Sequence, residues 1–451
     1  MKELSTTGVT WRGTLLAGLL IAVGVSVGYW YLTRGDRAPQ ADALLEAIRR
    51  SDLPTIARYL DRGGSAEAPI DVNGRQVSLL QAATEDREEQ IAVALLDAGA
   101  TFQGSEVDAT HVALNGLTEV VRRLLPIAAD QPIAHTGVAS AADNGYFDVV
   151  EVYLSQSDGR REEWLTEYGR AANVAMSVGY DDVARLLIDS GASLDEVLHT
   201  AARFSSAGLV RDLLARGLDV NEPLTIPGVQ ERTPIDFAWR RYQDEEAWYA
   251  EHAEDPRHTA NRSHDAEYVL FELARAGGRL EGVDLNQVAK DPLAEIGSVQ
   301  GSEAQLIVAA RVGLLDVVDT ILSSRAVRDE NNLRAATIVA LRNDHDDIAR
   351  RLLEVGAPVD GGVLHAAAAT SSPGLVRWLL RHGADASERV DGASPLDVWF
   401  EERTTLDPEL VLHELIVAGA EVCGLVAKEK DLPGLSAMIL RDSAPFCWDN
   451  R

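Results

Sequence analysis

The 451-residue chain has only two cysteines, which excludes a disulfide-rich scaffold and a multi-cysteine zinc module. It has 42 lysine and arginine residues against 71 aspartates and glutamates, which gives a net charge of −29. So acidic a chain repels the phosphates of nucleic acid, and we therefore expect no nucleic-acid partner. Its 46% hydrophobic and 25% charged content is typical of a folded protein.

The sequence also lacks complete motifs for catalysis, cofactors or metals. It has no G-x-x-x-x-G-K-[ST] phosphate loop, and no G-x-G-x-x-G motif follows a predicted strand. His252, His258 and His264 are spaced six residues apart, which does not place three imidazoles on one face of a helix. We therefore predict a non-enzymatic protein with no catalytic residue, cofactor or metal ion. An enzyme with its site in the irregular region 226–304 stays open as the weaker alternative.

One long hydrophobic run lies near the amino terminus. Gly13–Leu32 is twenty residues without a charge, which as a helix spans a hydrocarbon core of about 30 Å. Aromatic residues stand at both ends, at Trp11 and at Tyr29-Trp30-Tyr31, where they suit the headgroup region. We predict a tail over 1–12, a transmembrane helix over 13–32 and a tether over 33–42.

A cleaved signal peptide is the alternative for this run, with Ser26 and Gly28 as small residues before the cut. The bulky residues that follow and the full spanning length favour an uncleaved anchor. Gly24 and Gly28 form a G-x-x-x-G pair, which predicts a helix-packing face and a weak homodimer through the membrane helix, although glycine is common in such helices. Flanking charges nearly balance, and they slightly favour a single pass through the inner (plasma) membrane with the large domain in the periplasm.

From residue 44 onward a short pattern recurs: two apolar residues, two variable residues, two more apolar residues, and then often Gly-Ala. Positions i, i+1, i+4 and i+5 share one face of a helix, and a glycine just beyond is free to take a positive φ and end it. Most steps run from 24 to 36 positions, which predicts a solenoid of short helices. Two examples are Val183 with Leu186-Leu187 before Gly191-Ala192, and Leu375-Val376 with Leu379-Leu380 before Gly383-Ala384.

A second short helix, rich in small residues, precedes each of these. Examples are Ala201-Ala202 and Ala366-Ala367-Ala368, where small side chains allow close packing of the paired helices. Thr233-Pro234 and Ser394-Pro395 suit helix starts, because a hydroxyl caps the first turn and proline fits the first helical position.

With these features the chain resembles the ankyrin-repeat family. The helix start T-P-L-H-x-A of that family is present in pieces, at Thr233-Pro234-Ile235, Ser394-Pro395-Leu396, Leu198-His199-Thr200 and Leu364-His365-Ala366. The resemblance implies an all-α fold, a curved solenoid of paired short helices with hairpin loops over 43–451, with a terminal cap at 424–451. It also gives His199 and His365 a hydrogen-bonding structural role at helix starts.

An insertion at 239–265 interrupts the repeats, and its front half is predicted to be an extended helix. Trp, Tyr and Arg dominate binding hot spots, and insertions in repeat proteins often lie on the binding face. We therefore expect protein-binding residues here: Trp239, Arg240, Arg241, Tyr242, Trp248 and Tyr249. The alternative is that these aromatic side chains fill a gap in an irregular stack.

The resemblance and the anchor together predict a protein–protein interaction scaffold at a membrane, with a partner that the sequence does not identify. The alternative is an accessory, protective or inhibitory partner of a neighbouring enzyme, since the layout is similar to ankyrin proteins found beside periplasmic catalases. Cys423 and Cys447 occupy equivalent places in successive units. Stacked helices lie about 8–10 Å apart, so regular stacking argues against a disulfide between them. The terminal unit is shortened, however, and an irregular cap would leave the bond open.

Overall fold

The computed structural model describes residues 41–72, 74–102, 109–128, 136–156, 161–224, 232–252, 264–324, 327, 329–402 and 408–423. The predicted membrane helix at 13–32, with Gly24 and Gly28, lies outside these ranges, as does the terminal cap at 424–451. None of the helices within the described ranges has the length and apolar character needed to cross a membrane.

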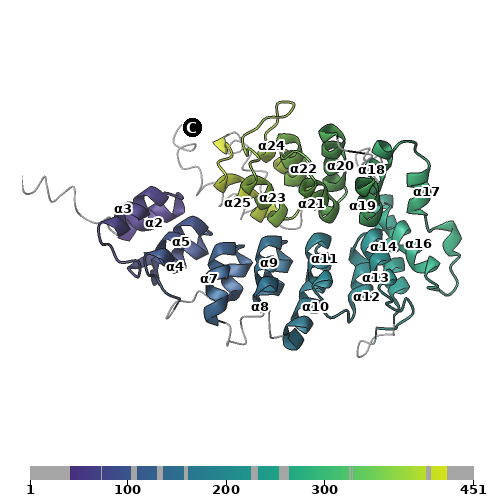
Figure 1. The fold of residues 1–451 in the computed structure, drawn as a ribbon, viewed down its shortest axis with the longest axis horizontal. Coiled ribbons are helices and arrows are strands. Elements are labelled where there is room, and N and C mark those ends of the chain that lie inside the picture. The colour runs from purple at the N-terminus through teal and green to yellow at the C-terminus, as the bar shows by residue number, and fades with distance from the viewer. Residues whose placement is uncertain are drawn as a thin grey trace, which may run out of the picture. The chain divides into compact units, whose positions relative to one another are not determined.

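The chain divides into two compact units, Met1–Thr101 and Phe102–Arg451. The described part of the first unit holds two helix pairs separated by an antiparallel hairpin, in which Ile70 pairs with Val77 and both side chains are buried. The elements of this unit are α2 (Ala41–Arg49), α3 (Leu53–Asp61), β1 (Pro69–Val72), β2 (Arg75–Ser78), α4 (Leu79–Glu85) and α5 (Glu89–Asp97) (Figure 1).

The second unit is built from further helix pairs. Its first part comprises α6 (Ala109–Leu114), α7 (Thr118–Ala128), α8 (Thr136–Asp143), α9 (Phe147–Ser155), α10 (Arg161–Ser177), α11 (Asp181–Asp189), α12 (Val197–Phe204), α13 (Ala207–Ala215), α14 (Pro234–Glu251) and α16 (Asp265–Arg275). Its second part comprises the 3₁₀ turn η2 (Leu285–Gln287), α17 (Pro292–Gly297), α18 (Ser302–Arg311), α19 (Leu315–Ser323), α20 (Glu330–Arg342), α21 (Asp346–Glu354), α22 (Gly361–Thr370), α23 (Pro373–Arg381), α24 (Pro395–Glu402) and α25 (Pro408–Val417). This mostly helical architecture of stacked pairs confirms the predicted fold class in its coarse form.

The apolar stripe and the terminal glycine form the second helix of each pair, as predicted. In α11, Val183 and Leu187 are fully buried. Gly191 follows this helix with φ +92°, and the next amide, that of Ala192, donates to the carbonyl of Leu187 at 3.1 Å. Only a residue that tolerates positive φ allows this closure, which is why glycine recurs there.

The first helix of each pair starts as the sequence indicates. At α24 the Ser394 amide and hydroxyl both donate to the Asp397 carboxylate, at 3.0 and 2.8 Å. The Asp397 amide donates back to the Ser394 hydroxyl at 3.2 Å, which completes a capping box. The ring of His365 is bonded through Nε2 to the carbonyl of Ala393 at 2.8 Å, and His199 contacts the carbonyl of Glu222 in the same way. Their predicted hydrogen-bonding structural role is confirmed.

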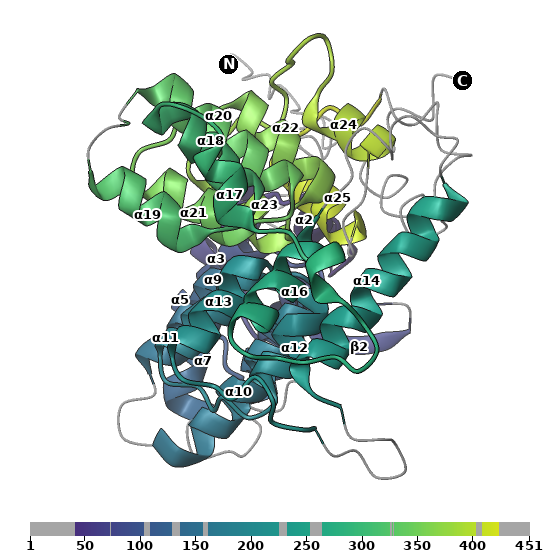
Figure 2. The ribbon, with the colours of Figure 1, turned by 90° about the vertical axis from the view of Figure 1, so that its right-hand side faces the viewer.

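The stack of the second unit reverses instead of continuing as one curved row. We call α6 to α13 the first row and α18 to α25 the second row. Figures 1 and 2 show the second helices of the two rows facing each other, with α21 against α11 and α23 against α9. The first helices, such as α10 and α20, lie on the outer sides.

Glycines allow the two rows to approach closely. A Cβ atom added to Gly374 in α23 would overlap the carbonyl oxygen of Gly145, which precedes α9. In the same way, a Cβ atom on Gly208 in α13 would overlap the carbonyl oxygen of Gly313, which precedes α19. Backbone therefore packs directly on backbone at both places.

Cys423, which follows α25, is disulfide-bonded in the structure. The argument from regular stacking against a bond is therefore wrong for this cysteine. That argument assumed the spacing of an ideal stack, which a terminal repeat need not keep. Cys447, the other cysteine of the chain, lies outside the described residues.

Candidate functional site

The six predicted protein-binding residues all lie on α14. The buried residues of this helix lie in its first turns, at Pro234, Ile235 and Ala238. The rings of Trp239 and Tyr242 stack at 5.3 Å, and both side chains are half-buried. Figure 2 shows the later turns of α14 running out past the neighbouring helices.

Arg240 and Arg241 point to different surroundings although they are adjacent. Arg240 is exposed and pairs with Asp244 at 3.2 Å. The Arg241 side chain is 15% exposed, and it donates through Nη1 to the carbonyl of Ser205 and through Nε to Glu245, both at 2.7 Å. Arg241 therefore ties α14 to the end of α12.

The last turns of α14 carry the most exposed aromatic group of the insertion. Trp248 is 42% exposed, and its ring lies 5.1 Å from that of Tyr249 and 4.3 Å from that of His252. The structure thus separates the six residues into a half-buried pair, an interior arginine, and an outward group at the end of the helix.

A second candidate site lies between the two rows. Arg185 in α11 pairs through Nε with Asp347 in α21 at 2.8 Å, and Arg350 in α21 pairs through Nε with Asp182 in α11 at 2.9 Å. These ion pairs are almost entirely removed from solvent and are reciprocal, as in a two-fold contact. Their charges satisfy each other in an environment where an unpaired charge is costly.

Two further carboxylates stand beside these ion pairs. Asp181 accepts the amide of Ser206 at 2.9 Å, and Asp346 accepts the amide of Ser372 at 3.0 Å. Burial raises the pKa of both carboxyls, that of Asp346 to about 7. Burial disfavours the charged form, because it replaces water with a medium that solvates charge poorly.

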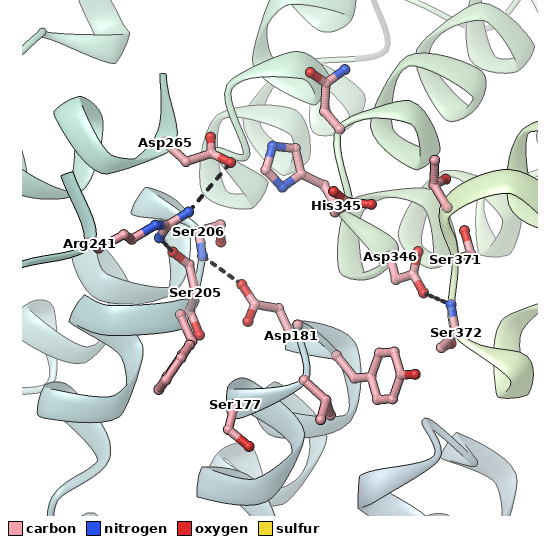
Figure 3. Close-up of a pocket in the computed structure, with 17 residues that line it drawn as sticks. Ser177, Asp181, Ser205, Ser206, Arg241, Asp265, His345, Asp346, Ser371 and Ser372 are labelled. Atoms are coloured by element: carbon pink, nitrogen blue, oxygen red, sulfur yellow. Dashed lines mark hydrogen bonds and ion pairs between the residues drawn. The ribbon is translucent and has the colours of Figure 1, made fainter. Parts of the chain in front are cut away.

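The two carboxylates line a cavity of about 280 Å³. Figure 3 shows Asp181 and Asp346 on opposite sides of it, with Arg241 and Asp265 on a third side. Its remaining lining comes from Ser177, Val178, Gly179, Tyr180, Phe204, Ser205, Ser206, Asn343, Asp344, His345, Thr370, Ser371 and Ser372. The insertion helix and both rows therefore contribute to one polar cavity.

We did not predict this cavity from the sequence, although a signal was present. Asp181-Asp182-Val183-Ala184-Arg185 at the start of α11 returns as Asp346-Asp347-Ile348-Ala349-Arg350 at the start of α21. Ser205-Ser206-Ala207-Gly208 similarly returns as Ser371-Ser372-Pro373-Gly374. Repeated charges on the second helix of a pair, followed by repeated serine and glycine, indicate a second contact face.

The histidines of the insertion serve local contacts. His264 lies 3.1 Å from Glu267, and His252 stacks on Trp248, while His258 lies outside the described residues. Among the residues whose positions the structure gives, no three His, Cys, Asp or Glu side chains are grouped so as to hold a metal ion.

Antiparallel helix pairs with intervening hairpins define a helical-repeat protein. Residues 304–396 match the family model for ankyrin repeats, in three copies. Over 428 residues the chain is 22% identical to Ankyrin repeat and KH domain-containing protein mask-1 of Caenorhabditis elegans, a match that covers 79% of this chain and 16% of that protein. Residues 304–396 therefore carry ankyrin repeats, and the chain spans less than a fifth of that relative.

Proposed function

We propose that this ankyrin-repeat protein is a non-enzymatic scaffold that binds a protein partner through the end of α14. Ankyrin repeats suggest a role in protein–protein interaction. The observation that carries the specific proposal is that α14 continues for several turns beyond its buried residues and presents Trp248 to solvent. Exposed tryptophan and tyrosine supply much of the binding energy of protein interfaces.

Within this proposal the six predicted residues have different roles. Trp248 and Tyr249 form the contact, with Arg240 on the same exposed helix. Arg241 holds the helix in place through Ser205 and Glu245. Replacing Arg241 should therefore change both binding and stability, whereas replacing Trp248 should change binding alone.

A photo-crosslinking amino acid at position 248 of the full chain tests the contact. We expect it to capture one defined protein, and the capture should be lost when Tyr249 and Arg240 are changed to Ala. The control is the same crosslinker at Val355, which is 40% exposed in the second row. Equal capture of the same proteins from both positions would contradict the proposal.

We also propose that residues 13–32 anchor the scaffold in a membrane as a single pass, with the repeats on the periplasmic side. Support comes from the uncharged length of this run and its terminal aromatic residues, and from the disulfide of Cys423, since such bonds persist in oxidising compartments. A reporter fused after Arg451 that is active only in the periplasm tests the topology. Activity of a cytoplasmic reporter there would reverse it.

The identity of the crosslinked protein also tests the accessory role beside a neighbouring enzyme. A captured enzyme whose activity changes when the scaffold is added would favour that role. A captured structural or signalling protein would favour the general scaffold.

A further inference from the structure

The contact between the two rows has the pattern of a two-fold interface. Asp182 and Arg185 lie in α11, and Asp347 and Arg350 hold the same places in α21. Each arginine pairs with the aspartate of the other row, at 2.8 and 2.9 Å. In a two-fold interface a residue i of one side contacts a residue j of the other, and j contacts i. The faces of the two rows are therefore equivalent as well as complementary.

The glycine contacts follow the same relation. Gly208 in α13 lies against the carbonyl of Gly313, and Gly374 in α23 lies against the carbonyl of Gly145. The helices α13 and α23 each belong to the pair that follows α11 or α21. Gly145 and Gly313 each precede the second helix of the pair before it, at α9 and at α19. The two-fold relation thus extends to the pairs on both sides of the central ion pairs.

Charged side chains join the rows, whereas each row also packs within itself. Across the contact, Arg377 donates to the carbonyl of Asn115 at 3.2 Å, and the guanidinium of Arg350 lies 3.9 Å from the centre of the Phe147 ring. Within the rows, α11 packs on α10 and α21 packs on α20. Interfaces that are not mainly apolar allow the parts they join to separate, because water solvates the charged groups. The rows are therefore separable in a way that the helices of one pair are not.

The segment that joins the rows has few buried residues. After α16 the chain runs through 276–301 before it enters α18, and only Gly278, Pro292 and Ile296 of this stretch are buried. Its backbone is tied to α16 where the amide of Lys290 donates to the carbonyl of Glu267 at 3.1 Å. Fully extended, a stretch of this length reaches roughly 85 Å, because each residue adds about 3.3 Å. It is long enough to connect the rows when they are apart.

We propose that two copies of the chain exchange rows, so that the first row of each copy packs on the second row of the other. The segment 276–301 opens, and the contacts of the closed chain form again between the copies. Such an exchange costs little free energy, because the dimer has the same contacts as the monomer. Each polar cavity of the dimer then takes Asp181 from one copy and Asp346 from the other. The exchange does not involve the outward end of α14, so its test leaves the proposed protein contact undecided.

Charge reversal in the full chain tests the exchange. The first variant carries Asp182→Arg with Arg185→Asp, the second carries Asp347→Arg with Arg350→Asp, and a third carries all four changes. When the first or the second variant closes on itself, like charges meet in a buried contact, which is strongly unfavourable. In the variant with all four changes opposite charges meet again, so it should fold as a closed chain, which circular dichroism checks.

Expressing the first two variants together restores both ion pairs only through exchange. The reversed row of one copy meets the reversed row of the other, and the two original rows meet each other. With a different affinity tag on each variant, we expect a one-to-one dimer by light scattering. Co-purification should be at least tenfold greater than when the first variant is expressed with the original chain. That mixture is the matched control, because it offers no reversed partner row and keeps any association through residues 13–32.

Three outcomes of this experiment would overturn the proposal. They are equal co-purification in the two mixtures, a mixture of the two variants that stays unfolded while the variant with all four changes folds, and a dimer of the first variant by itself, which would indicate that like rows pair. If the variant with all four changes does not fold, the original chain refolded from urea at rising concentration decides. A dimer whose fraction rises with concentration and that persists on dilution would support the exchange. Monomers at every concentration, or dimers that dissociate at once on dilution, would contradict it.

Discussion

The two rows of the second unit meet through equivalent residues, yet the helices beyond them differ. At the row contact, Arg185 and Arg350 each pair with an aspartate of the other row. Gly208 and Gly374 each lie against a backbone carbonyl of the other row. The arginine–aspartate pair and the glycine–carbonyl contact each occur once per row, so the contact resembles a two-fold interface between two copies.

The difference appears between α14, which follows the first row, and α24, which belongs to the second row. Both begin with a hydroxyl residue, proline, an aliphatic residue and aspartate, at Thr233 and at Ser394. Trp399 in α24 is fully buried, and its Nε1 donates to the carbonyl of Pro408 at 2.9 Å. Trp248 in α14 faces solvent instead. The start of the helix is constrained by packing in both, whereas the extension of α14 is not needed for packing and is available for binding.

The largest expected effect comes from breaking one of the reciprocal ion pairs. Arg350→Ala leaves Asp182 buried and unpaired, and it should lower the free energy of unfolding by about 3–5 kcal/mol. Arg185→Ala leaves Asp347 buried and unpaired in the same way, and we expect a loss of similar size. Denaturant unfolding measures both. The control Arg170→Ala removes an exposed pair with Glu167 and should cost at most about 1 kcal/mol.

The glycine contacts should be next in size. Gly374→Ala and Gly208→Ala each force the two rows apart, and we expect a loss of about 1–3 kcal/mol in each, measured by denaturant unfolding. Gly297→Ala in α17 is the matched control, because nothing lies within 4 Å of the added atom. Losses no larger than that of the control would show that the rows do not pack as described.

The stability of the contact should depend on pH through Asp346. Burial raises its pKa from 3.8 to about 7, so the folded chain binds a proton more tightly than the unfolded chain. This contribution to stability is present at low pH and is lost between about pH 4 and pH 7. The melting temperature of Asp346→Asn should therefore rise relative to that of the original chain as pH increases. The control Glu303→Gln should give a curve of melting temperature against pH that runs parallel to that of the original chain. A parallel curve for Asp346→Asn would contradict this expectation.

The smallest effect on stability should come from the exposed tryptophan. Trp248→Ala should change the free energy of unfolding by no more than about 0.5 kcal/mol, because the side chain faces solvent. Trp399→Ala in the equivalent helix should cost about 3–5 kcal/mol. Thermal unfolding of the two variants compares them directly. Similar losses would mean that Trp248 fills a gap in the stack.

The helices were predictable from the sequence because their causes are local. A stripe such as Val183 and Leu187 and a glycine such as Gly191 determine a helix and its end within about ten residues. The reversal of the stack was not predictable in this way, since it depends on contacts such as that of Gly145 with Gly374. The candidate cavity follows from the reversal, because Asp181 and Asp346 come from different rows.

The reversal also changes how the chain must fold. In a simple repeat array each unit contacts only its neighbours, so folding spreads along the chain from any starting point. Here the second helices of the first row bury polar side chains such as Asp182 only when α21 is in place. A ribosome-bound chain that ends before residue 346 therefore exposes this face while synthesis continues. Contacts between residues so distant in the sequence form slowly. We therefore expect the face of the first row to become buried late, after the last repeats have emerged from the ribosome.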